Sequence, residues 1–247
     1  MKILLLGTAG YHPSERRHTP CLLIPECRVM LDAGTGLFRA VPHLRPPRLD
    51  IFLTHAHLDH IVGLTYLLSV LYVRPLDKVS VHGTPGTLEA IREHLFAPAV
   101  FPVAPPFEFC PLTTERIDLE GSGVLTHFPL KHPGGSIGYR LEWPGHSMAY
   151  VTDTTAEPDA PYLDRIRGVD LLLHECYLPD RQADFARKTG HSHTTAVAEL
   201  ARRAGVGRLV LVHLNPIAAE KDPIGLDVAR AVFPETTLGE DGMEVEF

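Results

Sequence analysis

The sequence predicts an α/β protein in which sheets are covered by helices. Apolar runs of strand length alternate with helical segments from the first residues to the last, and this mixture is typical of layered α/β folds. Some runs, such as Leu209–His213, are apolar almost throughout, as expected for a buried strand. The hydrophobic fraction of 45% and the charged fraction of 21% exclude a disordered chain.

The predicted strands are short apolar runs with glycine, proline or polar residues at their ends. They are Ile3–Leu6, Leu22–Ile24, Arg28–Asp32, Leu49–Thr54, Val79–His82, Val124–Phe128, Gly138–Glu142, Met148–Asp153, Val169–His174 and Leu209–His213.

Three helices are predicted between these strands. Leu64–Val73 is an apolar run of helical length, and Thr84–Phe96 begins near a proline that suits a first helical turn. In Thr195–Ala204 the apolar residues recur at i, i+3, i+4 and i+7, while charged residues occupy the other faces. This last segment is therefore expected to pack one face against a sheet.

The proline-rich stretch from Pro98 to Pro111 is expected to be an extended surface connection. It contains five prolines. A linker between two independent domains is the alternative, but the candidate site residues described below lie on both sides of it. We therefore expect a single domain that covers residues 1–247.

Composition and charge exclude several classes of protein. The formal net charge of −7 argues against a chain held to nucleic acid mainly by charge. No apolar run approaches the roughly 18 residues of a membrane span, and the apolar run Ile3–Leu6 is shorter than a secretory signal needs. The four cysteines form no CxxC pair, which fits reduced thiols. We expect a cytoplasmic protein with no membrane partner.

Metal-ligating side chains are concentrated between Thr54 and His60, where the sequence is Thr-His-Ala-His-Leu-Asp-His. In an extended chain, residues two apart point the same way, so His55 and His57 can reach one metal ion. A turn after them lets Asp59 and His60 address a second ion. Imidazole and carboxylate are ligands for zinc, manganese and iron. Four such groups in six residues predict a metal centre.

Three more candidate ligands stand at the carboxyl ends of predicted strands, where α/β folds gather their sites. His132 follows one strand, and Asp153 and His213 each close another. Taken singly, each has a structural explanation as a strand-end histidine or a helix-capping aspartate. Together with the histidine cluster, they predict a larger ligand set.

The series His55-x-His57-x-Asp59-His60, then His132, Asp153 and His213, resembles the motifs of the metallo-β-lactamase superfamily. Gly63 also stands where the superfamily places a glycine. The resemblance covers nearly the whole chain. It implies an αββα sandwich, in which two mixed sheets pack face to face with helices outside and the site lies along one edge.

The resemblance also implies a dinuclear centre, with Zn²⁺ as the first choice and Mn²⁺ or Fe²⁺ as alternatives. Its ligand set, carried over by position, gives His55, His57 and His132 to one ion, Asp59, His60 and His213 to the other, and Asp153 to both. Asp32 is expected to hydrogen-bond a ligand histidine. Two such ions lower the pKa of a water, which can then attack an ester, thioester or phosphodiester. The β-lactamases proper often carry cysteine in place of Asp153, so antibiotic hydrolysis is not expected.

Glu175 and a Gly-His-Ser segment at residues 190–192 resemble the phosphodiesterase branch of the superfamily, which includes tRNA 3′-processing endonucleases and cyclic phosphodiesterases. Hydrolysis of a phosphodiester expels an alkoxide that needs a proton, and an imidazole held by a carboxylate is a suitable general acid. His191 and Glu175 would form this pair. His193 is the alternative general acid, and it could instead cap the following helix.

A small or cyclic phosphodiester is the first expected substrate. The stretch Tyr162–Gly190 leaves no room for the arm with which tRNA endonucleases grip tRNA, and Leu214-Asn215-Pro216 replaces their Ser-Arg-Tyr type of ending. A tRNA 3′-processing endonuclease and a thioester or lactone hydrolase remain alternatives. A structural zinc on Cys21 and Cys27, as in phosphoribosyl cyclic phosphodiesterases, is left open. A homodimer is possible by the same resemblance.

Overall fold

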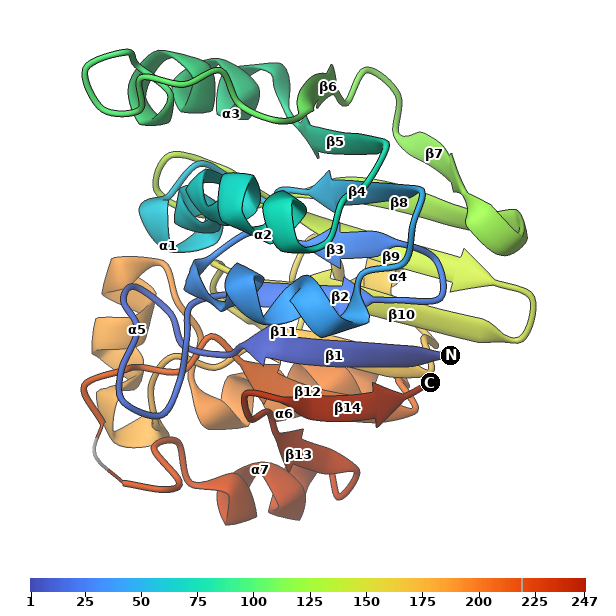
Figure 1. Cartoon of the computed structure of the whole chain (residues 1–247). Helices are drawn as coiled ribbons and strands as arrows, with labels where there is room; N and C mark the ends of the chain where they lie inside the picture. The colour runs from blue at the N-terminus through green and yellow to red at the C-terminus, as the bar shows by residue number, and fades with distance from the viewer. Residues whose placement is uncertain (219) are drawn as a thin grey trace. The chain divides into compact units, whose positions relative to one another are not determined.

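The structure, a computed structural model, describes residues 1–218 and 220–247 (Figure 1). The chain forms two compact units, one made of residues 1–114 with 241–246 and the other of residues 115–240 with 247. Each unit contains one seven-stranded mixed sheet with helices, so the predicted α/β class is confirmed. That these units act as a single domain stays a prediction.

The first unit is built on a sheet in the order β14-β1-β2-β3-β4-β5-β6. Its strands are β1 Lys2–Gly7, β2 Cys21–Ile24, β3 Val29–Leu31, β4 Arg48–Phe52, β5 Lys78–Gly83, β6 Glu108–Pro111 and β14 Met243–Glu246. The strands from β3 to β6 run parallel, whereas β1 is antiparallel to both of its neighbours. The carboxyl ends of β1, β3, β4 and β5 therefore lie at one edge of this sheet.

Helices cover one face of this sheet (Figure 1). They are α1 Leu58–Ile61, α2 Leu67–Val73 and α3 Pro85–Ala90, with 3-10 segments Thr35–His43 and Val62–Tyr66 and a π-helical turn Ile91–Leu95. Their buried residues, among them Leu37, Leu67 and Ile91, pack with Met30 and Ile51 of the sheet in one core. Burial of this apolar surface is the main force that holds the layer in place.

The second unit is built on a sheet in the order β13-β12-β11-β10-β9-β8-β7. Its strands are β7 Arg116–Leu119, β8 Gly123–Leu130, β9 Ser136–Trp143, β10 His146–Val151, β11 Leu171–Glu175, β12 Arg208–Val212 and β13 Thr236–Leu238. The strands from β10 to β13 are parallel, and β7 to β10 form an antiparallel meander. The carboxyl ends of β8, β10, β11 and β12 therefore share one edge.

The helices of the second unit are α4 Leu163–Ile166, α5 Ala183–Thr189, α6 Thr194–Ala204 and α7 Leu226–Val232, with 3-10 turns Glu120–Ser122 and Asp180–Gln182. The predicted apolar face of α6 is fully buried: Val197, Leu200, Ala201 and Ala204 belong to the unit's core. Helix α6 ends at Gly205, whose positive φ of 63° closes the helix in the left-handed conformation.

All ten predicted strands and three predicted helices are present, with small shifts at their ends. The strand predicted to reach Thr54 stops at Phe52, because the backbone amide of Thr54 donates to the Asp32 carboxylate at 2.8 Å. The proline-rich stretch was expected to be an extended connection, but its last residues form the edge strand β6. The strands β6, β7, β13 and β14 were not predicted, because they are short and their residues are partly exposed.

None of the helices in the described parts of the chain combines the length and the apolarity that a membrane-spanning segment needs. The longest regular α-helix, α6, has 11 residues.

Gly63 marks a close approach of two backbone segments in the first unit. Its amide donates to the carbonyl of Ala33 at 2.8 Å. A Cβ atom at Gly63 would lie 2.2 Å from the carbonyl oxygen of Gly34 and 2.7 Å from that of Ala33. Gly34 is under the same restriction, because a Cβ there would lie 2.3 Å from the carbonyl oxygen of Asp59. The close packing of backbone atoms, rather than an unusual backbone conformation, therefore requires glycine at these two positions.

Replacement Gly63→Ala should therefore lower the free energy of unfolding by about 1–3 kcal/mol, because backbone atoms have to move to admit the methyl group. Gly86→Ala is the matched control, because nothing lies within 4 Å of its Cβ position and it is inside helix α3. That control should be neutral or stabilising by up to about 1 kcal/mol. Urea unfolding of both variants tests the expectation, and equal stabilities would contradict it.

Candidate metal centre

The histidine cluster of the first unit lies in the loop that joins β4 to α1. His57 is the residue before the first turn of α1, and His60 lies within that helix. The rings of His55 and His57 are 4.4 Å apart between centroids, and those of His55 and His60 are 4.3 Å apart. The predicted grouping of these imidazoles is therefore present within one unit.

Asp32 orients two histidines of the cluster, His60 directly and His55 through Thr54. It is fully buried at the end of β3, and its Oδ2 accepts from Nδ1 of His60 at 2.7 Å. The hydroxyl of Thr54 donates to Asp32 and accepts from Nδ1 of His55 at 3.0 Å. Both histidines therefore carry a proton on Nδ1 and a lone pair on Nε2. A buried carboxylate that fixes the tautomer in this way is typical of the shell around a metal site.

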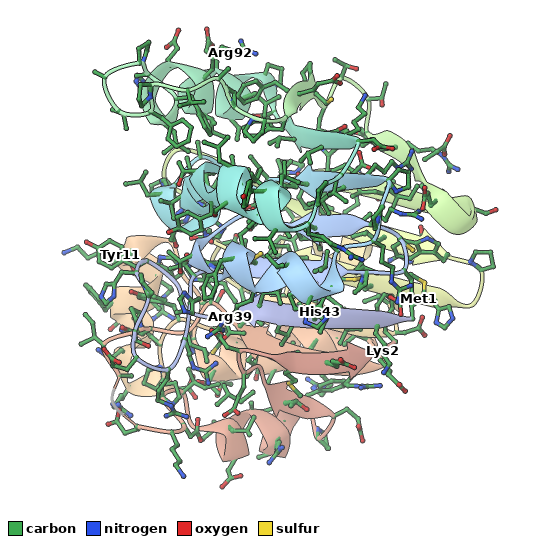
Figure 2. The ribbon with its side chains drawn as sticks, viewed as in Figure 1. Met1, Lys2, Tyr11, Arg39, His43 and Arg92 are labelled. Atoms are coloured by element: carbon green, nitrogen blue, oxygen red, sulfur yellow. The ribbon has the colours of Figure 1, made fainter. Side chains whose placement is uncertain are left out.

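The Asp59 carboxylate is held between His60 and the loop after β1. Its Oδ2 lies 3.4 Å from Nε2 of His60 and accepts from the backbone amide of Tyr11 at 2.8 Å. Tyr11 has a positive φ of 64°, and its ring, labelled in Figure 2, is 71% exposed. A non-glycine residue in this conformation is strained, and the surroundings must hold it there.

A single acidic residue holds the loop after β1 to the segment that directly precedes β14 in the first unit. The carboxylate of Asp241 accepts from Thr8 at 2.7 Å, from the amide of His18 at 2.6 Å and from Arg39 at 2.5 Å. Arg39 is labelled in Figure 2. The loop that supplies the Tyr11 amide to Asp59 is therefore anchored far from its own position in the sequence.

In the second unit, Asp153 stands between two imidazoles. Its Oδ1 lies 3.5 Å from Nε2 of His132, and its Oδ2 lies 3.3 Å from Nε2 of His213. Nδ1 of His132 donates to the carbonyl of Gly190 at 3.2 Å, which leaves the lone pair on Nε2. Burial lowers the pKa of His132, against the opposing charge of Asp153, and so favours the neutral imidazole that a metal requires.

Three of the site residues have left-handed backbone conformations that non-glycine residues rarely adopt. Asp32, Asp153 and His213 have φ angles of 56°, 52° and 53°, and each comes within two residues of the end of a strand. Each costs free energy, of the order of 1–3 kcal/mol, that the rest of the fold has to offset. These backbone conformations turn the chain sharply just after each strand ends, at the edge of the sheet.

The donor sets fit divalent transition metals. Neutral imidazole nitrogens and carboxylate oxygens are the ligands of catalytic zinc sites and suit manganese and iron as well. In Asp153 the two oxygens face different imidazoles, which is the arrangement that a carboxylate shared between two ions needs. The seven predicted ligands divide into four in the first unit and three in the second, and their joint action on two ions stays a prediction.

Glu175 and His191 form the predicted acid pair. Nδ1 of His191 lies 3.1 Å from Oε1 of Glu175, and Glu175 is fully buried at the end of β11. One ligand atom from each of Asp153, His191 and His213 lies within 4.8 Å of the others. His191 therefore has its carboxylate partner on one side and predicted metal ligands close by.

Several residues that hold this pair were not found from the sequence. The amides of Thr154 and Ser192 donate to the two oxygens of Glu175 at 2.6 and 3.0 Å. The ring of Tyr177 stacks on His191 at 4.6 Å between centroids. The serine of the Gly-His-Ser segment was a usable signal for Ser192, whereas Thr154 and Tyr177 carry no local pattern.

His193 has a different partner. Its Nδ1 lies 2.6 Å from Oδ1 of Asp180, and the same carboxylate accepts from the amide of Thr195 at 2.9 Å. Asp180 thus holds His193 and at the same time caps the first turn of α6. The structure gives the Glu175 contact to His191 and the Asp180 contact to His193, and the side chain of His193 does not itself cap the helix.

The two cysteines considered for a structural zinc are both buried in the first unit. Among the described residues, no group of three ligand atoms close enough for a metal includes Cys21 or Cys27. Burial raises the pKa of the Cys21 thiol well above its usual range, so the residue behaves as a core side chain.

The sequence model of the beta-lactamase superfamily domain matches residues 27–214. The chain belongs to the metallo-β-lactamase superfamily.

Curated relatives include ribonuclease Z of Bradyrhizobium sp. (strain ORS 278), which is 29% identical over 295 residues and is covered, like this chain, to 97%. Among solved structures, the metallo-beta-lactamase fold protein YhfI from Bacillus subtilis has a TM-score of 0.82 at 19% identity, with 99% of each chain covered. The short form of human tRNase Z has a TM-score of 0.74 at 23% identity and covers 100% of this chain and 99% of its own. These likenesses confirm the metallo-β-lactamase fold.

The superfamily match, the ribonuclease Z relative and the clustered groups able to bind metal together identify the chain as a metal-dependent hydrolase of the nuclease and phosphodiesterase type. The predicted enzyme class is thereby confirmed.

The Asp180 cap yields a prediction about pH. Burial alone would raise the pKa of Asp180, but hydrogen bonds from Thr195 and the contact with His193 outweigh burial and lower it. A lowered carboxylate pKa stabilises the fold above the unfolded value of about 3.9 and ceases to do so as the pH falls through the folded value. Asp180→Asn should cost about 1 kcal/mol at pH 7 and progressively less below pH ~4.

Urea unfolding of Asp180→Asn from pH 7 to pH 3 measures this difference. Asp184→Asn is the control, because its fully exposed side chain pairs only with Arg187 three residues on. The control should lie within about 0.5 kcal/mol of the wild type at every pH. A loss of stability in Asp180→Asn that does not shrink in acid would contradict the assignment.

Proposed function

We propose that the protein is a metal-dependent ribonuclease that hydrolyses a phosphodiester bond of RNA, with tRNA precursors as the first substrate to test. The observation that carries this proposal is the Glu175–His191 pair beside Asp153 and His213, because it supplies a proton donor for a poor leaving group. The ribonuclease Z relative, matched over almost its full length, supports RNA as the substrate. This reverses the order expected from the sequence, which placed a small or cyclic phosphodiester before tRNA.

The proposed ligand set follows the family pattern. His55, His57 and His132 would hold one ion, Asp59, His60 and His213 the other, and Asp153 both. Zn²⁺ is the first choice among the ions that accept these ligands. When bound, the two ions would stabilise charge on the phosphoryl oxygens and lower the pKa of a water enough for attack at neutral pH.

The protein's own residues then handle the departing group. Cleavage releases an alkoxide, and we assign its protonation to Nε2 of His191. Glu175 stabilises the protonated ring through Nδ1, as a buried carboxylate does for a catalytic imidazole. The amides of Thr154 and Ser192 fix Glu175, and Tyr177 limits the rotation of the ring by stacking on it. His193 remains the alternative general acid, although its Nδ1 already contacts the carboxylate of Asp180.

A small phosphodiester remains the second candidate, and the length of the chain favours it. At least 48 of the 295 positions aligned with the Bradyrhizobium ribonuclease have no counterpart in a chain of 247 residues. These missing positions agree with the expectation from the sequence that the chain lacks the arm with which tRNA endonucleases grip tRNA. The net charge of −7 also weakens general attraction to RNA.

The role of His191 predicts a dependence on the leaving group. His191→Ala should slow hydrolysis of an RNA phosphodiester by about 10²–10⁴-fold, because the alkoxide loses its proton donor. Hydrolysis of bis(p-nitrophenyl) phosphate should fall far less, because its phenolate leaves without much protonation. Steady-state rates on both substrates, with the metal content of each preparation measured, test this expectation.

His94→Ala is the control for that series, because His94 is an exposed histidine of the first unit. Its rates on both substrates should match the wild type. Equal losses on RNA and on the nitrophenyl ester in His191→Ala would remove His191 from the acid role, and the same experiment on His193→Ala would then identify the alternative.

The choice of substrate is tested on four compounds. Metal-loaded protein is incubated with a 3′-extended tRNA, a 2′,3′-cyclic nucleotide, bis(p-nitrophenyl) phosphate and a glutathione thioester, beside Asp59→Ala. Trimming of the tRNA at about 0.15 M salt, absent in the variant, is the expected result. Turnover of the cyclic nucleotide alone would favour the second candidate, and turnover of the thioester alone would overturn both.

A further inference from the structure

A cavity of about 610 Å³ lies in the second unit and is lined by residues that neighbour or contact the Glu175–His191 pair. Its wall includes His132, Thr154 and Gly190. Each of these takes part in the site: Thr154 donates to Glu175, and the carbonyl of Gly190 accepts from His132. The cavity therefore shares wall residues with the site, and a group bound in it would contact residues that hold Glu175 and His132 in place.

The charge of the cavity is opposite to that of the chain. Lys131, Arg187 and Lys188 line it, and Glu157 is its one acidic residue, whereas the whole chain carries −7. Arg187 forms an ion pair with Asp184. Within residues 1–218 and 220–247, neither lysine forms an ion pair with a protein carboxylate. Two ammonium groups that line one cavity without forming an ion pair to a protein carboxylate favour an anionic ligand.

The remainder of the wall is largely apolar. Pro133, Pro161 and Tyr162 contribute to it, and the Tyr162 hydroxyl is already bonded to Nε2 of His174 at 2.9 Å. Tyr162 is buried, so it offers apolar ring surface rather than a polar group. Because cationic side chains and apolar surface both line the cavity, its lining suits a sugar phosphate or a nucleotide.

The two lysines come from elements that the site itself holds in place. Lys131 directly precedes His132, and its carbonyl accepts from the hydroxyl of Thr154 at 3.4 Å. Lys188 lies in the last turn of α5, two residues before Gly190. Since both segments also position the reacting groups, binding of an anion here is tied to the geometry of the site.

We propose that this cavity binds a second phosphate group of the substrate, one nucleotide away from the bond that is cleaved. Lys131 and Lys188 neutralise its charge, and the apolar wall contacts the intervening nucleoside. The proposal rests on the proposed function and makes it more specific: it selects chains with consecutive phosphates over an isolated cyclic phosphodiester, which has a single phosphate.

Binding of adenosine 3′,5′-bisphosphate tests the cavity without any need for turnover. Calorimetry on metal-loaded protein at about 0.15 M salt compares it with adenosine 3′-monophosphate and adenosine 5′-monophosphate. The bisphosphate should bind about 10-fold or more tighter than either monophosphate, because it makes an additional charge-assisted contact. In the double variant Lys131→Ala with Lys188→Ala, this advantage should disappear.

The control is Arg202→Ala with Arg203→Ala, which removes the same charge from the exposed side of α6. It should keep the full advantage of the bisphosphate. The proposal is overturned if the lysine variant keeps that advantage, or if both variants lose it equally, since the effect would then reflect net charge alone. Thermal unfolding of both variants verifies that they are folded.

The outcome is separable from that of the proposed function. A preference for the bisphosphate that requires the two lysines, in a protein that does not cleave RNA, supports the phosphate site and counts against the ribonuclease. Cleavage of RNA with no preference for the bisphosphate supports the ribonuclease and overturns the phosphate site.

Discussion

A carboxylate that is buried away from water must find its hydrogen bonds inside the protein, and each unit has a fully buried group of this kind at the edge where its parallel strands end. In the first unit, Asp32 binds Thr54 and His60. In the second, Glu175 binds Thr154, Ser192 and His191. Both are fully buried. Removing either one would leave several donors unsatisfied, so the loops around the site depend on these two side chains.

The two buried carboxylates have different consequences for chemistry. Asp32 places the proton of His60 on Nδ1 and so directs the lone pair of Nε2 outward as a metal donor. Glu175 makes the same kind of contact with His191, and in the proposed function this contact would stabilise the ring that protonates the leaving group. In the proposed function, the same carboxylate–imidazole contact would therefore orient a metal ligand in one unit and a general acid in the other.

The local charge around the site also departs from that of the whole protein. The chain is acidic, yet the cavity beside His132 is lined by three cations. Recognition of a phosphate here would come from short-range contacts in a defined cavity rather than from general attraction, which salt screens within about a Debye length. This is consistent with a nuclease-type enzyme that is shorter than its ribonuclease Z relative.

The sequence by itself determined the α/β class, the strands and helices that carry the site, and the residue types of a metal-dependent hydrolase, because apolar periodicity and the spacing of His55 to His60 are local properties of the chain. It left the choice between His191 and His193 open and gave no sign that Lys131 and Lys188 share a cavity. The family resemblance suggested the Glu175–His191 pair, and the structure contains it, whereas only the tertiary structure placed Asp180 against His193 and those two lysines around one space. The reason is that such contacts depend on which strands are neighbours in the sheet and on how the loops after them turn. The spacing of residues along the chain specifies neither of these.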